Sequence, residues 1–138
     1  MSEPVAHVTR AYRFSAAHRL YAEGLSEDEN RALYGKCTNP AGHGHNYRVE
    51  VTVRGPIDPV TGMAADLGRL DGVVNEFVVA RFDHRHLNRD PAFAGDRVPT
   101  GELIARTVWE LVAPHLPPGT LRRVRIVETR DNVFEYRE

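Results

Sequence analysis

HGHNYRVEVTVR, residues 43–54, is the clearest strand signal in the chain. Apolar or histidine side chains alternate there with polar ones, and successive side chains of a strand point to opposite faces of a sheet. The stretch therefore predicts a half-buried strand whose apolar face begins with two histidines. That face carries His43, His45, Tyr47, Val49, Val51 and Val53, whereas Asn46, Arg48, Glu50, Thr52 and Arg54 share the other face.

A second alternating stretch, HVTRAYRFSAAH at residues 7–18, precedes the first. Its pattern also predicts a half-buried strand, with His18 on the apolar side and His7 on the polar side. If the two strands pair, the imidazoles of His18, His43 and His45 can converge at one end of the sheet. The apolar parity of residues 7–18 comprises Val8, Tyr12, Phe14, Ala16 and His18.

Two helices are predicted between these strands and the C-terminal part of the chain. Asp66 fits the N-cap of a helix of about four turns, whose apolar stripe ends at Phe82. A second helix begins at Thr100, with Glu102 favoured in its first turn, and the PPG at 117–119 stops it. Its inner stripe comprises Ile104, Val108, Leu111, Val112 and His115.

Shorter elements complete the pattern. Residues 121–129 and 133–137 read as two strands around an RDN turn, and a short strand through 63–65 follows the DPVTG turn. Residues 19–42 look irregular apart from a short helix capped by Ser26 and Glu29, and residues 83–98 look like a loop. The order β-β-α-α-β-β predicts an α+β fold, with helices on one face of an antiparallel sheet.

Composition places the chain in a broad class. Its 138 residues suit one domain, 1–138, and its net charge of −1 includes no basic run. We therefore expect neither nucleic acid nor an anionic membrane surface as partner. A single cysteine excludes an intramolecular disulfide. The N-terminal stretch lacks the apolar core of a signal peptide, and no apolar run has membrane-spanning length, so a cytoplasmic location is expected.

Histidine pairs offer two candidate metal sites. Zinc favours histidine ligands, and a catalytic zinc keeps three protein ligands and one open position. His18, His43 and His45 would be the three protein ligands. The alternative is that these are structural histidines. His84 and His86 form a rival metal-binding pair. Alternatively, Asp83 and His84 form a proton relay, or the whole stretch is a solvated polar loop.

Two further side chains are candidates for chemistry. Cys37 can act as a nucleophile, a general base or a fourth zinc ligand, or be an inert loop residue. Glu128 shares a strand parity with Val124 and Ile126, and a buried carboxylate needs a partner. Two parallel N–H donors on the amidine-like edge of a ligand such as a pterin or guanine can supply that partner, as can a nearby arginine.

Together these stretches resemble the 6-pyruvoyl-tetrahydropterin synthase family. The motifs FSAAHRL, GKCTNPAGHGHNY, IDPVTGM, FDHRHLN, PTGE and VETRDN occur in the family's order and span residues 12 to about 138. Five residues separate Cys37 from HGH, which looks like the pyruvoyl branch rather than the 6-carboxy-tetrahydropterin synthase branch of queuosine biosynthesis. Two departures are Gly101, where hydroxyl residues are common, and HRHLN in place of HKNLD.

The resemblance implies a role for each candidate residue. It implies Zn2+ as cofactor, Cys37 as a catalytic proton acceptor, Asp83 and His84 as a catalytic relay, and Glu128 as the pterin anchor. Thr100 and Glu102 would lie in the same subsite as Glu128. The implied zinc ligands are His18, His43 and His45.

The resemblance also implies a fold and a reaction. The fold would be the tunnelling fold, a four-stranded antiparallel sheet with two helices, whose trimers close into a barrel and stack into homohexamers. The substrate would be 7,8-dihydroneopterin triphosphate of tetrahydrobiopterin biosynthesis, with active sites between subunits. The 6-carboxy synthase and a non-catalytic zinc-stabilised module are the alternatives. Phosphate contacts stay open among Arg19, Lys36 and Arg85.

Overall fold

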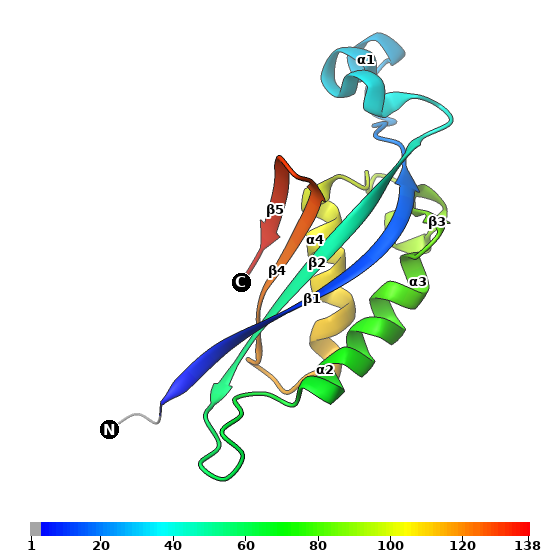
Figure 1. Cartoon of the computed structure of the whole chain (residues 1–138). Helices are drawn as coiled ribbons and strands as arrows, with labels where there is room; N and C mark the ends of the chain where they lie inside the picture. Colours follow the sequence, from blue (N-terminus) through cyan, green and yellow to red (C-terminus); the bar gives the residue numbers. More distant parts are fainter. Residues whose placement is uncertain (1–3) are drawn as a thin grey trace.

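Two long antiparallel strands form the centre of the molecule. The computed structural model describes residues 4–138, so the first three residues of the expected domain lie outside the described part. Strand β1 (Val5–His18) pairs along its whole length with β2 (His43–Pro56), and both strands curve across the molecule (Figure 1). The register sets Phe14 opposite Tyr47 and His18 opposite His43, so the two predicted apolar rows lie on the same face of the sheet.

The sheet has five strands in the order β3-β1-β2-β4-β5. Strands β4 (Leu121–Thr129) and β5 (Asn132–Tyr136) form the predicted C-terminal hairpin. The prediction of four antiparallel strands was wrong in one respect, because β3 (Arg85–His86) adds a short strand parallel to β1. Two residues of a loop carry no period-two pattern, so this strand left no signal in the sequence.

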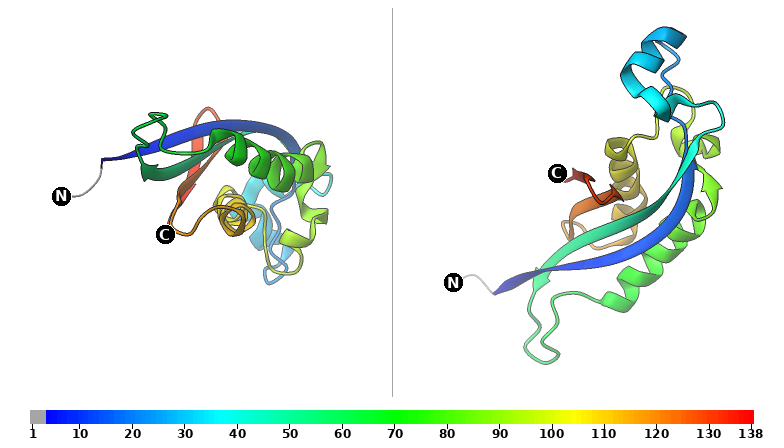
Figure 2. Two further views of the ribbon diagram at one scale, coloured as in Figure 1. Left: turned by 90° about the horizontal axis from the view of Figure 1, so that it is seen from below. Right: turned by 45° about the horizontal axis from the view of Figure 1, so that its top comes forward.

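Both long helical segments cover one face of the sheet, as the left view of Figure 2 shows. The first consists of α2 (Leu67–Val74), a π-helical turn η2 (Asn75–Val79) and α3 (Ala80–Phe82). The second is α4 (Gly101–Val112), followed by the 3-10 turn η5 (Ala113–His115). Asp66 is the N-cap of the first segment, as predicted, and Thr100, where the sequence predicts the start of the second helix, is the N-cap of α4. Their side chains accept from the backbone N–H groups of Arg69 and Leu103.

The π turn fits the spacing of the apolar stripe. Leu70, Val74, Val78 and Phe82 are buried and follow one another at intervals of four residues. An α-helix has roughly 3.6 residues per turn, so this spacing would drift around an unbroken helix. The wider i→i+5 turn offsets part of that drift and keeps the four side chains against the sheet.

The connection between β1 and β2 extends beyond the end of the sheet. It contains α1 (Glu27–Tyr34) and the 3-10 turn η1 (Gly35–Thr38), and α1 lies past the end of β1 that carries His18 (Figures 1 and 2). The predicted capping box is present, since Ser26 accepts from the Glu29 N–H and the Glu29 carboxylate accepts from the Ser26 N–H.

Three further expectations were wrong. Residues 63–65 form no strand, because the Asp58 carboxylate closes the turn onto the N–H groups of Val60 and Thr61 and the chain then runs straight into the Asp66 cap. His115 lies outside the inner stripe of α4, exposed and stacked on Phe77, because the helix ends before Pro114.

Residues 83–98 are also more regular than a plain loop. Besides β3 they contain the 3-10 turns η3 (Leu87–Arg89) and η4 (Pro91–Phe93), with Leu87 and Phe93 in the core. Among residues 4–138, no helix combines the length and the apolar character that crossing a membrane requires.

Gly101 at the start of α4 leaves room for an aromatic ring from β5. It is buried, and a Cβ atom at this position would overlap the ring of Phe134. Phe134 pairs with Ile126 of β4, so its ring packs between the sheet and the first turn of α4. The departure at Gly101 therefore has a structural reason, because the glycine and the phenylalanine fill one space.

We expect Gly101→Ser to destabilise the protein by about 1–3 kcal/mol through overpacking. Adding Phe134→Val should relieve the overlap, so the double variant should be more stable than the sum of the single changes predicts, by about 0.5–3 kcal/mol. Urea unfolding at fixed protein concentration measures both quantities. Gly72→Ser is the matched control, since nothing lies within 4 Å of a Cβ at that exposed helix position. Additive single effects would contradict this account of the packing.

Candidate metal and pterin site

Three histidines meet where β1 ends and β2 begins. One ring nitrogen from each of His18, His43 and His45 lies within 4.8 Å of the others. His18 and His43 are cross-strand partners, and their Nε2 atoms are 3.1 Å apart. Two residues along β2, His45 lies opposite Ala16, whose small side chain leaves space for the ring.

The main chain of Pro99 fixes the orientation of His18. Its Nδ1 lies 2.8 Å from the Pro99 carbonyl oxygen, which only accepts, so Nδ1 carries the proton and donates. This leaves the lone pair of Nε2 facing His43. Burial lowers the pKa of His18 to about 4, and burial also lowers the pKa of His43. At neutral pH both rings are therefore uncharged, which is the form that binds metals.

The polar atoms at the site fit a metal ion. The Nε2 of His45 is buried and has no hydrogen-bond partner among the described residues. Ligand nitrogens 2.0–2.1 Å from a tetrahedral zinc lie roughly 3.3 Å from one another. The 3.1 Å between the Nε2 atoms of His18 and His43 is close to that separation. The three histidines can therefore hold a metal ion, and their nitrogen donors are ones that zinc favours.

Glu128 and Cys37 lie beside this cluster. The Oε1 atom of Glu128 is 3.7 Å from Nε2 of His45, and the Glu128 side chain is only 12% exposed. Burial raises the pKa of Tyr47, and the charges of Glu128 and Cys37 raise it further, so both side chains lie near the same phenol. Cys37 is half-buried in η1, and its carbonyl accepts from the Leu20 N–H at 2.8 Å. Backbone pairing thus holds the thiol's segment next to the end of β1.

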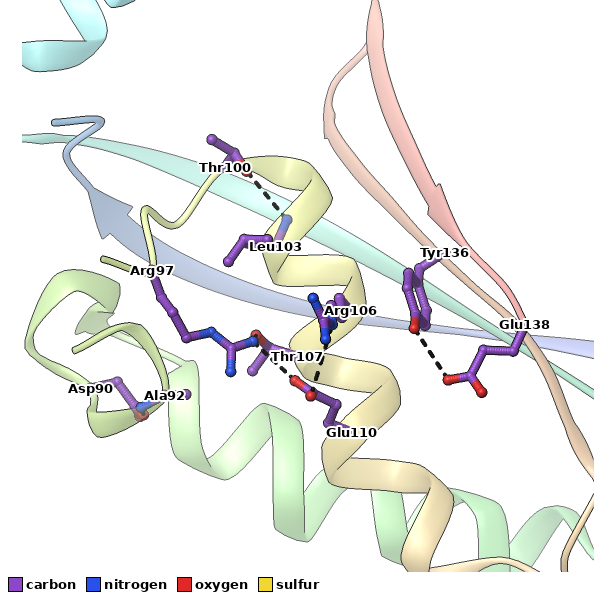
Figure 3. Close-up of polar contacts among 10 residues, drawn as sticks. All are labelled: Asp90, Ala92, Arg97, Thr100, Leu103, Arg106, Thr107, Glu110, Tyr136 and Glu138. Atoms are coloured by element: carbon purple, nitrogen blue, oxygen red, sulfur yellow. Dashed lines mark hydrogen bonds and ion pairs between the residues drawn. The ribbon is translucent and has the colours of Figure 1, made fainter. Parts of the chain in front are cut away.

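The N-terminus of α4 approaches from the helix side. Thr100 caps the helix with its hydroxyl oxygen, and Glu102 is exposed in the first turn. Figure 3 shows Arg97 just before this cap, reaching Thr107 at 3.3 Å and Glu110 at 3.0 Å. These bonds tie the segment before the helix, including the Pro99 carbonyl that orients His18, to the body of α4.

Asp83 and His84 lie at the end of the first helical segment. Nδ1 of His84 is 3.1 Å from Oδ2 of Asp83, while Oδ1 accepts from the Ser15 N–H. The Ser15 hydrogen bond holds the pKa of Asp83 below its usual range, with His84 contributing less. His84 has a positive φ of 59° and a side chain that is 83% exposed. Within one chain this pair faces solvent and no described contact joins it to the three histidines.

His86, the other histidine of the rival pair, does not join the metal cluster among the described residues. It pairs with Ala17 in β3, and its Nε2 lies close to Gly42, where a Cβ would be 2.9 Å away. The structure thus groups one H-x-H pair with His18, whereas His84 and His86 line a separate hollow beside β3 and stay outside the cluster. The Pro99 carbonyl and the Tyr47 hydroxyl also contact the ring of His18. The sequence carries no signal for the Pro99 contact, because a backbone carbonyl belongs to no side-chain pattern, and it places Tyr47 on the apolar face without indicating this contact.

Comparisons with known proteins agree on one family. Residues 7–138 match the family model described as 6-pyruvoyl tetrahydropterin synthase. The 6-pyruvoyl tetrahydrobiopterin synthase of Poecilia reticulata is 46% identical over 99% of this chain and 92% of its own length. That of Homo sapiens is 45% identical over 96% and 91%.

A solved structure is also similar. The 6-pyruvoyl tetrahydropterin synthase of Caenorhabditis elegans is 40% identical, covers 100% of this chain and 99% of its own, and superposes with a TM-score of 0.93. The fold is therefore the α+β fold of that enzyme. On the family model, the relatives and the structure together, the chain belongs to the 6-pyruvoyl tetrahydropterin synthase family.

Proposed function

We propose that this protein is a zinc-dependent 6-pyruvoyl-tetrahydropterin synthase that converts 7,8-dihydroneopterin triphosphate to 6-pyruvoyl-tetrahydropterin and triphosphate. The observation that carries the proposal is the meeting of three imidazoles with a shielded carboxylate, where His45 and Glu128 are 3.7 Å apart. A structural metal site has no need of that carboxylate or of a free thiol beside it. The catalytic and pterin-binding roles are part of this proposal.

Each group of residues has a separate task. His18, His43 and His45 would hold zinc, which supplies Lewis acidity that makes protons on carbons next to a bound oxygen easier to remove. Glu128 would accept two parallel N–H bonds from the pterin ring, with Thr100 and Glu102 lining the same end. The capping hydroxyl of Thr100 accepts from Leu103 but keeps its own hydrogen for donation.

Proton movement would fall to Cys37 and to the Asp83–His84 pair. A thiolate at Cys37 would take a proton from a side-chain carbon, and His84, oriented by Asp83, would exchange protons with side-chain oxygens. The pterin ring gains the hydrogens that its side chain loses, so the reaction needs no nicotinamide.

Assembly would complete the site. Along β1, β3 pairs only with Ala16 and Ala17, so most of that sheet edge is open among residues 4–138. An open edge is a template for pairing with another chain. We propose that sheets of three chains join into a barrel, that two trimers form a hexamer, and that the exposed His84 of one chain serves the Cys37 of another. Native mass spectrometry measures the assembly.

The direct test is product analysis. The zinc-loaded protein is incubated with 7,8-dihydroneopterin triphosphate without nicotinamide, and pterins and fragments are identified by mass spectrometry. A 6-pyruvoyl product with free triphosphate is expected. A 6-carboxy product with acetaldehyde would assign the chain to the 6-carboxy synthase branch instead, and unchanged substrate with an assembled, metallated protein would favour a non-catalytic zinc module.

We expect His43→Ala to lose most bound zinc and Cys37→Ala to keep it, while both lose turnover. The reason is that His43 supplies a ligand nitrogen, whereas Cys37 is proposed to move a proton without binding the ion. Zinc content by elemental analysis and turnover measure the two effects. His7→Ala, exposed at the other end of β1, is the matched control and should change neither. Zinc loss in Cys37→Ala would make Cys37 a ligand and overturn its assigned role.

We expect Glu128→Gln to weaken pterin binding by about 10- to 150-fold, since hydrogen bonds to a charged group contribute about 1.5–3 kcal/mol. Zinc content should stay unchanged, because Glu128 is not proposed as a ligand. Fluorescence titration with an oxidised pterin such as biopterin measures the affinity. Glu76→Gln, an exposed carboxylate on the first helical segment, is the control. Equal pterin affinity in both variants would remove the anchoring role.

A further inference from the structure

A cavity of about 420 Å³ opens beside η1, between the end of β1 and α1. Its lining includes three cationic side chains, Arg19, Arg31 and Lys36, against one carboxylate, Glu27. This excess of positive charge is local, because the chain as a whole has a net charge of −1.

The cationic groups are only partly engaged within the protein. The guanidinium of Arg19 lies over the Tyr21 ring at 4.2 Å, and its Nε donates to the Thr38 carbonyl at 2.9 Å. That bond fixes the plane of the guanidinium and leaves both terminal nitrogens without an acceptor in residues 4–138. Lys36 is exposed and has no carboxylate partner in the same range, whereas Arg31 pairs with Glu27 and Asp28.

An unpartnered hydroxyl provides a second, independent indication of a ligand. Thr38 lines the cavity and is 7% exposed, and its Oγ1 is buried with no hydrogen-bond partner among the described residues. Leaving a buried hydroxyl unpaired costs about 1–3 kcal/mol. A fixed guanidinium, a free ammonium and an unpaired hydroxyl together form the donor set that phosphate oxygens accept from.

We propose that this cavity binds a polyphosphate group, and that it holds the triphosphate end of the substrate; the second part rests on the proposed function. Lys36 and Thr38 flank Cys37, and Arg19 follows His18 directly. A chain of phosphates held here would therefore place the attached carbons near the proposed proton acceptor and the metal ligands. Of the three open candidates for phosphate contacts, Arg19 and Lys36 meet in this cavity, whereas Arg85 lines a different hollow with His84.

The test is calorimetric titration of the zinc-loaded protein with inorganic tripolyphosphate. Lys36→Met should weaken binding at least about tenfold, because it removes a charge-assisted hydrogen bond. Thr38→Val should weaken binding without lowering the melting temperature, because it deletes a hydroxyl that has no partner in the protein. Arg54→Gln, an exposed arginine near the far end of β2, is the control and should bind as the wild type does.

Three results would overturn the site: no binding to the wild type, equal binding in Lys36→Met, or binding that disappears in His43→Ala. The last would show that tripolyphosphate binds the metal rather than the cavity. The experiments distinguish failure of the anion site from failure of the proposed function. If tripolyphosphate binds as expected but the pterin triphosphate is not converted, the anion site stands and the function falls. If conversion occurs with an unchanged KM in Lys36→Met, the function stands and the site falls.

Discussion

The register between β1 and β2 is the constraint on which the core and the site both depend. It stacks Phe14 on Tyr47, with ring centroids 5.1 Å apart, and it brings His18 opposite His43. A slip of one residue would turn every side chain of one strand to the other face, so the buried valines of β2 and its histidines keep each other in place. The three histidines that could hold a metal ion are therefore the last members of the same apolar row that forms the core, and the strand pairing that fixes this row also fixes them.

Periodicity predicted this part of the molecule because every residue of a long strand contributes to the pattern. It failed where the structure depends on a few tertiary contacts. The pairing of β3 rests on two residues, the loop at 58–63 closes on a single aspartate, and His115 leaves its predicted stripe after Pro114. Cap residues were predictable at Ser26, Asp66 and Thr100 because a cap is a local hydrogen bond within three residues.

The rest of the candidate site could not be assembled from local sequence. Parity placed Glu128 on the apolar side of its strand, but its approach to His45 depends on the pairing of β2 with β4, in which Arg48 lies opposite Val127. Cys37 reaches the end of β1 through one backbone bond to Leu20. For these residues the family resemblance supplied the grouping, and the geometry of the chain is compatible with it. Asp83 and His84 differ, since they are exposed in one chain and their catalytic role depends on the proposed assembly.

The distribution of unpaired polar atoms argues that this end of the sheet is built for binding rather than for stability. Of the five buried side-chain atoms without partners among residues 4–138, three belong to Thr38, His43 and His45, which line the proposed anion cavity or the histidine cluster. Each unpaired atom lowers the stability of the folded chain, and such a cost persists only where the surrounding structure fixes the geometry. Here the fully paired β1–β2 ladder does so. A metal ion would satisfy the Nε2 of His45 and an anion would satisfy the hydroxyl of Thr38, so binding at both sites would offset part of this loss of stability.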